Sequence, residues 1–275
     1  MFISDDLIFL QLQKTAGTHI AALLMQHLGG RMKGKHNALD FDPGDRLVVG
    51  SVRNPWDWYV SLWSYGCSAN GGVQGLLKDS RAGTARRIAG AAWRDPARWG
   101  AALRDIAAHA GRDVDFWRAC YADPLDAAAF RRWLTAILSP EGRALLGADY
   151  AARPLARHAG FYTYRMLTIF TPVAAWRAGA DSLRDPAGIA AFFQTAGAVD
   201  MFVRTETLED DLAAVFARIG RPEVTAAVLR GTRTNASFRS GTAHYYDAAT
   251  RELVARSDPF PIARFGYTFD VGDLT

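Results

Sequence analysis

Alternating apolar and polar stretches divide the first part of the chain into strands and helices. Residues 7–12, LIFLQL, form an almost continuous apolar run, which is typical of a strand buried on both faces. After a short polar turn, apolar side chains recur with helical spacing from Ile20 to Leu28, and Gly29 and Gly30 end the pattern. This segment therefore predicts a strand, a tight turn and a helix.

The same order of elements then occurs again. Residues 46–52, RLVVGSV, indicate a second buried strand, and Asn54 can cap a helix that has Pro55 at its first helical position. Three tryptophans lie at helical spacing here and are expected to belong mostly to the core: Trp56, Trp58 and Trp63.

A long helical region separates these elements from the next strand. Residues 66–199 are rich in Ala, Arg and Trp and are interrupted by Asp-Pro and Ser-Pro pairs. Residues 200–203, DMFV, predict a third core strand, and a helix follows from about Leu208 to Ile219. Strands that alternate with helices indicate an α/β fold with a parallel sheet. No linker composition marks a boundary, so we expect one domain over residues 1–275, with 66–199 as a large helical insertion.

Composition excludes several other classes of protein. Hydrophobic residues make up 49% and charged residues 22%, and no run of 18 apolar residues exists that would span a bilayer. Cys67 and Cys120 are too few for a disulfide scaffold, and the acidic start lacks the features of a signal peptide, so we expect a cytoplasmic location. The net charge of +4 comes from scattered arginines without a dense basic run, which argues against nucleic acid as a partner. The oligomeric state is left open.

The turn between the first strand and helix has the chemistry of a phosphate site. Unpaired amides at a helix N-terminus and the helix dipole both favour an anion there. The turn adds a cation, two hydroxyl donors and a glycine that permits close backbone approach: Lys14, Thr15, Thr18 and Gly17. The Walker A pattern G-x-x-x-x-G-K-[ST] is absent, because Ile8 and Gln13 stand where its glycines belong. A triphosphate-hydrolysing P-loop is therefore disfavoured.

The order Lys-Thr-x-Gly-Thr resembles the loop that holds the 5′-phosphosulfate in sulfotransferases that use 3′-phosphoadenosine 5′-phosphosulfate (PAPS). Residues 49–61, VGSVRNPWDWYVS, resemble the family's 3′-phosphate site, an arginine at a strand end and a serine eight residues later. These are Arg53 and Ser61, and their R-N-P form is similar to the carbohydrate branch, with Golgi and bacterial Nod-type members. One guanidinium and one hydroxyl suit phosphate binding.

Two further segments resemble the same family. Residues 199–212, VDMFVRTETLEDDL, look like its strand that ends in R-x-E-x-L, where Glu206 is expected to hold the strand-to-helix corner. Residues 233–247, RTNASFRSGTAHYYD, and the closing FGY at 265–267 resemble the C-terminal end, whose loop folds over the nucleotide. The resemblance assigns three residues of this loop to the nucleotide site: Asn235, Ser237 and Arg239.

The resemblance implies a P-loop-NTPase-like parallel sheet flanked by helices, and in-line transfer of a sulfuryl group from PAPS to a hydroxyl of a carbohydrate or other small acceptor. Lys14 would then neutralise charge on the leaving oxygen. The implied donor site comprises Lys14, Thr15, Ala16, Gly17, Thr18, His19, Arg53 and Ser61. No metal is implied, and the six histidines show no ligand spacing. The unmatched region 66–199 is expected to shape the acceptor site.

His36, in KGKHN between the first helix and the second strand, is the predicted general base. A neutral imidazole suits proton abstraction near pH 7, and carbohydrate-type relatives often place a histidine in this interval. The alternative is an exposed loop histidine without a catalytic role. His19 is the second candidate for the base, and Asp40 and Asp42 come third. Two lysines lie close to His36 in the sequence, Lys33 and Lys35. They either attract an anionic acceptor or lie in solvent.

Other hypotheses stay open beside the sulfotransferase. One is a P-loop-like nucleotide kinase, and another is a nucleotide-binding protein without activity. Arg53 has a structural alternative as a helix-flanking salt-bridge residue, and Ser61 has one as a surface serine. Tyr162 and Tyr164 either stack on an acceptor ring or belong to the core.

Overall fold

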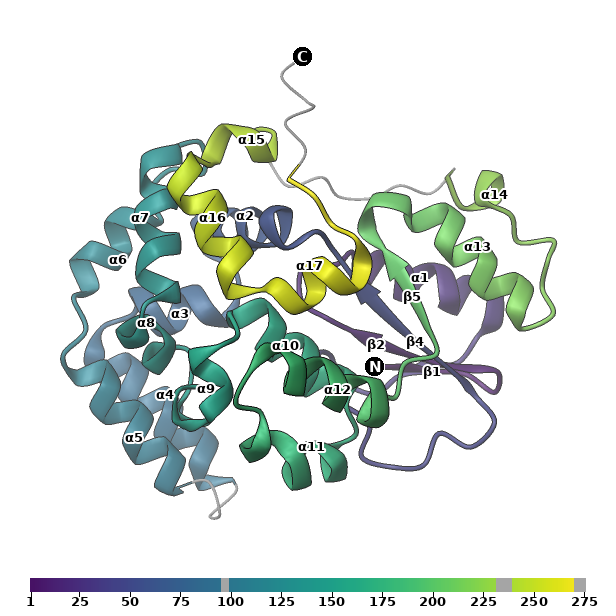
Figure 1. The fold of residues 1–275 in the computed structure, drawn as a ribbon, viewed down its shortest axis with the longest axis horizontal. Coiled ribbons are helices and arrows are strands. Elements are labelled where there is room, and N and C mark those ends of the chain that lie inside the picture. Colours follow the sequence, from purple (N-terminus) through teal and green to yellow (C-terminus); the bar gives the residue numbers. More distant parts are fainter. Residues whose placement is uncertain (95–98, 231–238, 270–275) are drawn as a thin grey trace. The chain divides into compact units, whose positions relative to one another are not determined.

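The computed structural model describes residues 1–94, 99–230 and 239–269. The chain divides into two compact units, and each unit is assembled from separate segments. Unit 1 contains Met1–Trp58 and Tyr162–Ala236, and unit 2 contains Tyr59–Phe161 and Ser237–Thr275. The described strands all lie in unit 1, while unit 2 is helical in its described part (Figure 1). That the two units act as one sulfotransferase domain stays a prediction.

Unit 1 is built on a five-stranded mixed sheet with the order β3-β1-β2-β4-β5. Its strands are β1 (Phe2–Ile3), β2 (Leu7–Gln11), β3 (Arg31–Met32), β4 (Leu47–Val52) and β5 (Met201–Arg204). The central strands β2, β4 and β5 are parallel, which confirms the α/β class and the three predicted strands. The sheet is not wholly parallel, because β1 pairs antiparallel with both β2 and β3.

Helices cover both faces of this sheet. Those of unit 1 are α1 (Gly17–Leu28), α10 (Phe161–Phe170, whose first residue belongs to unit 2), α11 (Val173–Gly179), α12 (Pro186–Ala196), α13 (Leu208–Arg218) and α14 (Ala226–Arg230), with 3-10 turns at Ala180–Ser182 and Thr205–Thr207. Side chains of β2 alternate between the faces, as in any strand. Phe9 joins one core cluster with Leu24 of α1 and Phe216 of α13. On the opposite face, Phe170 of α10 packs edge-on against Phe202.

The carboxyl ends of the parallel strands meet at one edge of the sheet. Gln11 of β2 lies in register with Ser51 of β4, and Val52 lies in register with Arg204 of β5. The segments that follow these residues therefore begin side by side. In open α/β sheets, ligands bind at this edge.

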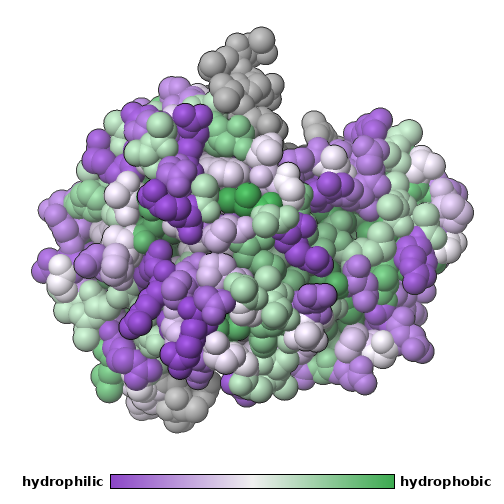
Figure 2. All heavy atoms as spheres, in the orientation of Figure 1, coloured by the Kyte–Doolittle hydropathy of each residue, from purple (hydrophilic) through white to green (hydrophobic). Residues whose placement is uncertain are grey.

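Unit 2 is an assembly of helices around an aromatic core. Its helices are α3 (Gly72–Lys78), α4 (Arg81–Trp93), α5 (Trp99–Ala110), α6 (Val114–Cys120), α7 (Ala127–Leu138), α8 (Pro140–Leu145), α9 (Ala148–Ala152), a 3-10 turn at Pro154–Arg157, α15 (Thr242–Tyr245), α16 (Ala248–Ser257) and α17 (Pro259–Phe265). The boundary between the units falls within α2 (Pro55–Cys67). Trp63 packs against Phe130 and Tyr245, and its indole donates to Cys120 O at 2.7 Å. Hydrophilic side chains are spread over the visible face of the molecule (Figure 2).

Candidate active site

The turn from β2 into α1 has an unusual backbone. Lys14 and Ala16 both adopt left-handed conformations, with φ of 63° and 55°. L-residues other than glycine rarely adopt such angles, and such residues cluster at ligand sites. No side chain caps the N-terminus of α1, which begins at Gly17. The turn therefore presents helix N-terminal amides beside a lysine, an arrangement suited to an anion.

The side chain of Thr15 points into the protein. Its side chain is fully buried, and its hydroxyl donates to Leu12 O at 2.8 Å and lies 2.6 Å from Ser51 Oγ. This pair joins the turn to β4. Thr18, by contrast, is exposed at the start of α1. Of the two predicted hydroxyl donors, Thr18 is therefore the one whose side chain is accessible.

Gly17 makes room for a buried glutamine. A Cβ at Gly17 would lie 3.2 Å from Cβ and Cγ of Gln11, closer than most real contacts. Gln11 is 1% exposed, and neither atom of its side-chain amide has a hydrogen-bond partner among the described residues. Nε2 of His19 is also buried and has no hydrogen-bond partner among the described residues. The end of β2 and the first turn of α1 thus each carry a residue with buried polar atoms that lack a partner among the described residues.

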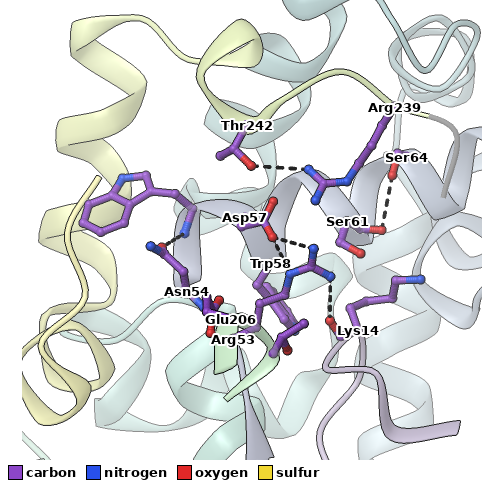
Figure 3. A network of polar contacts seen from close by, with 12 residues as sticks. Lys14, Arg53, Asn54, Asp57, Trp58, Ser61, Ser64, Glu206, Arg239 and Thr242 are labelled. Atoms are coloured by element: carbon purple, nitrogen blue, oxygen red, sulfur yellow. Dashed lines mark hydrogen bonds and ion pairs between the residues drawn. The ribbon is translucent and has the colours of Figure 1, made fainter. Parts of the chain in front are cut away.

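Arg53 joins the two sequence motifs. It follows β4, and its Nη1 donates to Lys14 O at 3.1 Å (Figure 3). Its Nε donates to Asp57 Oδ2 at 2.6 Å, and Nη2 forms an ion pair with the same carboxylate. Tyr162 fixes the backbone, since its hydroxyl accepts from Arg53 N and donates to Arg53 O. Arg53 is therefore a helix-flanking ion-pair residue and also contacts the turn between β2 and α1.

Helix α2 starts as the sequence predicts. Asn54 Oδ1 accepts from Trp56 N at 3.1 Å, and Pro55 is the first helical residue. Glu206 Oε1 accepts from Asn54 N at 2.7 Å, so it holds the start of α2. Its expected role at the corner between β5 and α13 stays a prediction. Burial raises the pKa of the Glu206 carboxyl above its usual value. The tryptophans Trp56, Trp58 and Trp63 are buried, which confirms their place in the core.

His36 lies against the end of β2. Its Nδ1 is 3.0 Å from Gln11 O, and a carbonyl only accepts, so Nδ1 carries the proton and Nε2 keeps its lone pair. Burial lowers the pKa of His36, and the positive charges of Arg165, Lys35 and the N-terminus lower it further. Near pH 7 His36 is thus a neutral imidazole with one basic nitrogen. Its side chain is partly exposed, and its role as the base stays a prediction.

Arg165 of α10 is a site residue that the sequence did not indicate. With the Gln13 amide oxygen turned toward it, its Nε and Nη2 donate to that oxygen at 3.1 and 2.5 Å. Burial lowers the pKa of the Arg165 guanidinium. The only signal was an arginine within an unmatched helical region, where arginines are common. Neighbouring Tyr162 is fully buried and Tyr164 partly buried.

The other predicted residues belong to unit 2 or are not among the described residues. Ser61, on α2 within unit 2, is only 3% exposed, so it is not a surface serine. Arg239, also in unit 2, donates to Thr242 Oγ1 at 3.3 Å (Figure 3). Asn235 and Ser237 lie outside the described residues.

The remaining charged residues of the His36 loop differ in their partners. Lys33 pairs with Asp40 at 3.0 Å, and this contact holds the pKa of the Asp40 carboxyl below its usual value. Lys35 is exposed and has no ion-pair partner within the described ranges. Asp42 accepts from Gly44 N at 2.9 Å, which forms a local turn. Asp40 and Asp42 are thus engaged in structural contacts.

Comparison with known proteins gives no relative. No protein-family model matches the chain, and neither a curated protein nor a solved structure matches it. Within the described residues, no helix combines the length and apolar character needed to cross a bilayer. The same residues contain no group of three His, Cys, Asp or Glu side chains arranged to hold a metal ion.

Proposed function

We propose that the chain is a PAPS-dependent sulfotransferase that acts on a hydroxyl of a carbohydrate or other small acceptor. The observation that carries the proposal is the contact between the two motifs. Arg53 Nη1 reaches Lys14 O although 39 positions separate the residues. A phosphate-binding turn and a second phosphate-binding residue at the ends of adjacent parallel strands suit a nucleotide with phosphate groups at both its 3′ and 5′ positions.

The residues at the turn fit such a donor. The uncapped start of α1 supplies backbone amides, Lys14 supplies a cation, and Gln11 and His19 have polar atoms without protein partners in the described structure. The parallel β2-β4-β5 core with a turn after β2 supports a P-loop-like arrangement as part of the same proposal. Lys14, Thr18, Arg53 and the amides near Gly17 would hold the donor.

The proposed reaction needs a proton acceptor and charge stabilisation. PAPS supplies the sulfuryl group, whose sulfur–oxygen bond to the 5′-phosphate breaks while a sulfur–oxygen bond to the acceptor forms. Lys14 stabilises the charge that develops on the departing phosphate oxygen. Nε2 of His36 takes the proton of the acceptor hydroxyl, because its Nδ1 is held by Gln11 O.

Binding of the spent donor tests this proposal. We expect 3′-phosphoadenosine 5′-phosphate (PAP) to raise the melting temperature more than ATP or GTP with magnesium does, because a ligand selective for the folded state stabilises it. Arg53→Ala should weaken this shift. A larger shift with a triphosphate would favour the nucleotide kinase instead. PAP binding without turnover on a broad hydroxyl panel would favour a binding protein without activity.

A cytoplasmic location belongs to the same proposal. Cys67 and Cys120 are both free thiols. Burial raises the pKa of the Cys67 thiol to about 12 and that of Cys120 to about 11. Two protonated, unbridged thiols are compatible with a reducing compartment.

A further inference from the structure

Arg165 differs in its partner from three arginines of unit 1 that pair with a carboxylate. Arg53 pairs with Asp57, Arg204 with Asp211 and Arg230 with Asp210. Arg165 contacts the neutral amide of Gln13, and no carboxylate of the described residues lies within ion-pair distance of it. Arg165 is partly buried. Arginine keeps its charge in proteins, and a charge partly withdrawn from water is normally paired. Arg165 is therefore a cation whose counter-charge the described chain does not provide.

The guanidinium also lies at the proposed site. Its contact, Gln13, directly precedes Lys14, and its charge acts on His36, which is bonded to Gln11 O. The Arg165 guanidinium and the proposed base His36 thus both contact residues 11–13, next to Lys14, which is proposed to stabilise the leaving group. Lys35, exposed beside His36, adds a second positive charge without an ion-pair partner in the described structure.

Arg165 reaches this edge from the side of the sheet opposite α1. The core cluster places α1 on the face of Phe9, whereas α10 packs through Phe170 on the face of Phe202. The loop that carries His36 lies on the α10 side too, because Val173 N, at the start of α11, donates to Leu39 O at 2.8 Å. The amides proposed for the donor lie at α1. Arg165 and His36 therefore lie on the side of the sheet opposite the proposed donor site, and this side is available to the acceptor.

We propose that Arg165 binds a negatively charged group of the acceptor, a carboxylate or a sulfate or phosphate ester, next to the hydroxyl that receives the sulfuryl group. This inference rests on the sulfotransferase function proposed above. A planar guanidinium with paired N–H donors suits bidentate recognition of such a group. The acceptor is accordingly an acidic hydroxyl compound rather than a neutral one.

Acceptor pairs that differ only in charge test the inference. The free acid and methyl ester of 4-nitrophenyl glucuronide, of 4-hydroxybenzoate and of N-acetyltyrosine are compared for kcat/KM with PAPS. They are also compared for binding, with and without PAP, by thermal shift. We expect at least one acid to exceed its ester by about 10- to 100-fold in kcat/KM, the effect of a hydrogen bond to a charged group. The acid should also give the larger thermal shift.

Three variants assign this preference to Arg165. Arg165→Gln should abolish it and leave the Kd for PAP within about twofold, while Arg165→Lys should keep part of it. Arg177→Gln, which removes an exposed arginine of α11, is the matched control and should keep all of it. A tenfold loss of PAP affinity in Arg165→Gln would place Arg165 at the donor and overturn the inference.

Failure of the inference and of the proposed function differ in outcome. If PAP binds but no acid is distinguished from its ester, or if the preference survives in Arg165→Gln, the acidic acceptor is refuted while the donor site stands. If the parent chain binds an acid through Arg165 but does not bind PAP, the sulfotransferase proposal is refuted and the anion site stands.

Discussion

Lys14 lies in the turn between β2 and α1 and has a left-handed backbone conformation, with φ of 63°. Replacement by a small residue removes the ammonium group without removing a buried apolar side chain. We expect Lys14→Ala to lower kcat about 10²- to 10³-fold, because it removes the ammonium group that we propose stabilises the developing charge. The melting temperature should change little. Steady-state kinetics and circular dichroism measure both quantities.

A matched control for Lys14→Ala is available in the same chain. Lys78→Ala removes the lysine at the end of α3, in unit 2. It should leave kcat unchanged. Equal rates for Lys14→Ala and the parent chain would refute the role assigned to Lys14.

The charges around His36 predict how the rate depends on pH. Burial, Arg165, Lys35 and the N-terminus all lower the pKa of His36 below 6.5, whereas its contact with Gln11 O raises it. A base acts in its neutral form, so kcat/KM should fall only at pH values below 6.5. Arg165→Gln removes a positive charge, which should raise the pKa of His36 and move the acid limb to higher pH.

The shift in the acid limb has a readout that does not need activity. Proton NMR of the His36 ring, assigned by its loss in His36→Gln, reports the same titration. Arg177→Gln should leave the ring titration where it is. An unchanged titration in Arg165→Gln would contradict the proximity of the two side chains.

At the scale of elements, the hydroxyl pair between the turn and β4 predicts two separable effects. Thr15→Val leaves Ser51 Oγ without its buried partner and should lower the free energy of unfolding by about 1–3 kcal/mol. Thr18→Val, at an exposed position, should change stability by less than about 0.5 kcal/mol but weaken PAP binding. Urea unfolding and PAP titration measure the two. The reverse outcome would mean that Thr15 faces the donor.

Close packing between β4, α10 and β5 predicts the cost of a methyl group. A Cβ at Gly50 would lie 3.0 Å from ring atoms of both Phe170 and Phe202. We expect Gly50→Ala to destabilise unit 1 by about 1–3 kcal/mol through overpacking. Gly90→Ala in α4 meets open space and should stabilise by up to about 1 kcal/mol. Denaturant midpoints compare the two alanines, and equal effects would contradict the tight fit at Gly50.

These elements also indicate how far the sequence could lead. The strands β2, β4 and β5 and the starts of α1 and α2 followed from apolar runs, helical spacing and Asn54-Pro55. The strand β1 was missed because a two-residue strand has no periodicity, and its place depends on pairing with β2. Arg165 was missed for a related reason. Its role depends on the packing of α10 against the sheet, which no local pattern encodes.

The directions of the side chains in the turn between β2 and α1 could not be predicted from the sequence either. A list of loop residues does not say that Thr15 turns into the core while Thr18 faces solvent. The register does explain it afterwards, because Ser51 lies opposite Gln11 and meets the Thr15 hydroxyl. Asn54 was identified correctly as the cap of α2, because its place before Pro55 marks a helix start. The contact between Glu206 and Asn54 N was not predicted, because it depends on the pairing of β4 with β5.

At the scale of the whole molecule, one buried histidine predicts loss of stability in mild acid. His109 in unit 2 is 3% exposed, and burial, followed by the charge of Arg112, lowers its pKa from 6.5 to about 4. Between these values the unfolded chain binds the proton and the folded chain does not. The contribution of neutral His109 to the free energy of unfolding is therefore complete above pH 6.5 and is lost as the pH falls to about 4.

A non-titrating replacement tests this assignment. His109→Gln keeps an acceptor for Arg112 Nη1 and removes the proton site. It should reduce the slope of unfolding free energy against pH between 4 and 6.5, by up to about 1.4 kcal/mol per pH unit. Urea unfolding across this range provides the measurement. An unaltered slope would assign the acid sensitivity to other groups.

The discontinuous make-up of unit 1 has a consequence for how the protein is made. Synthesis delivers β2, α1 and β4 first, and then the segment Tyr59–Phe161 of unit 2, before α10 and β5 leave the ribosome. At typical elongation rates this delay is on the order of ten seconds. During this delay the backbone N–H and C=O groups on one edge of β4 lack the strand β5 that pairs with them in the folded protein. Chaperones that shield nascent strands should therefore improve the yield of folded protein.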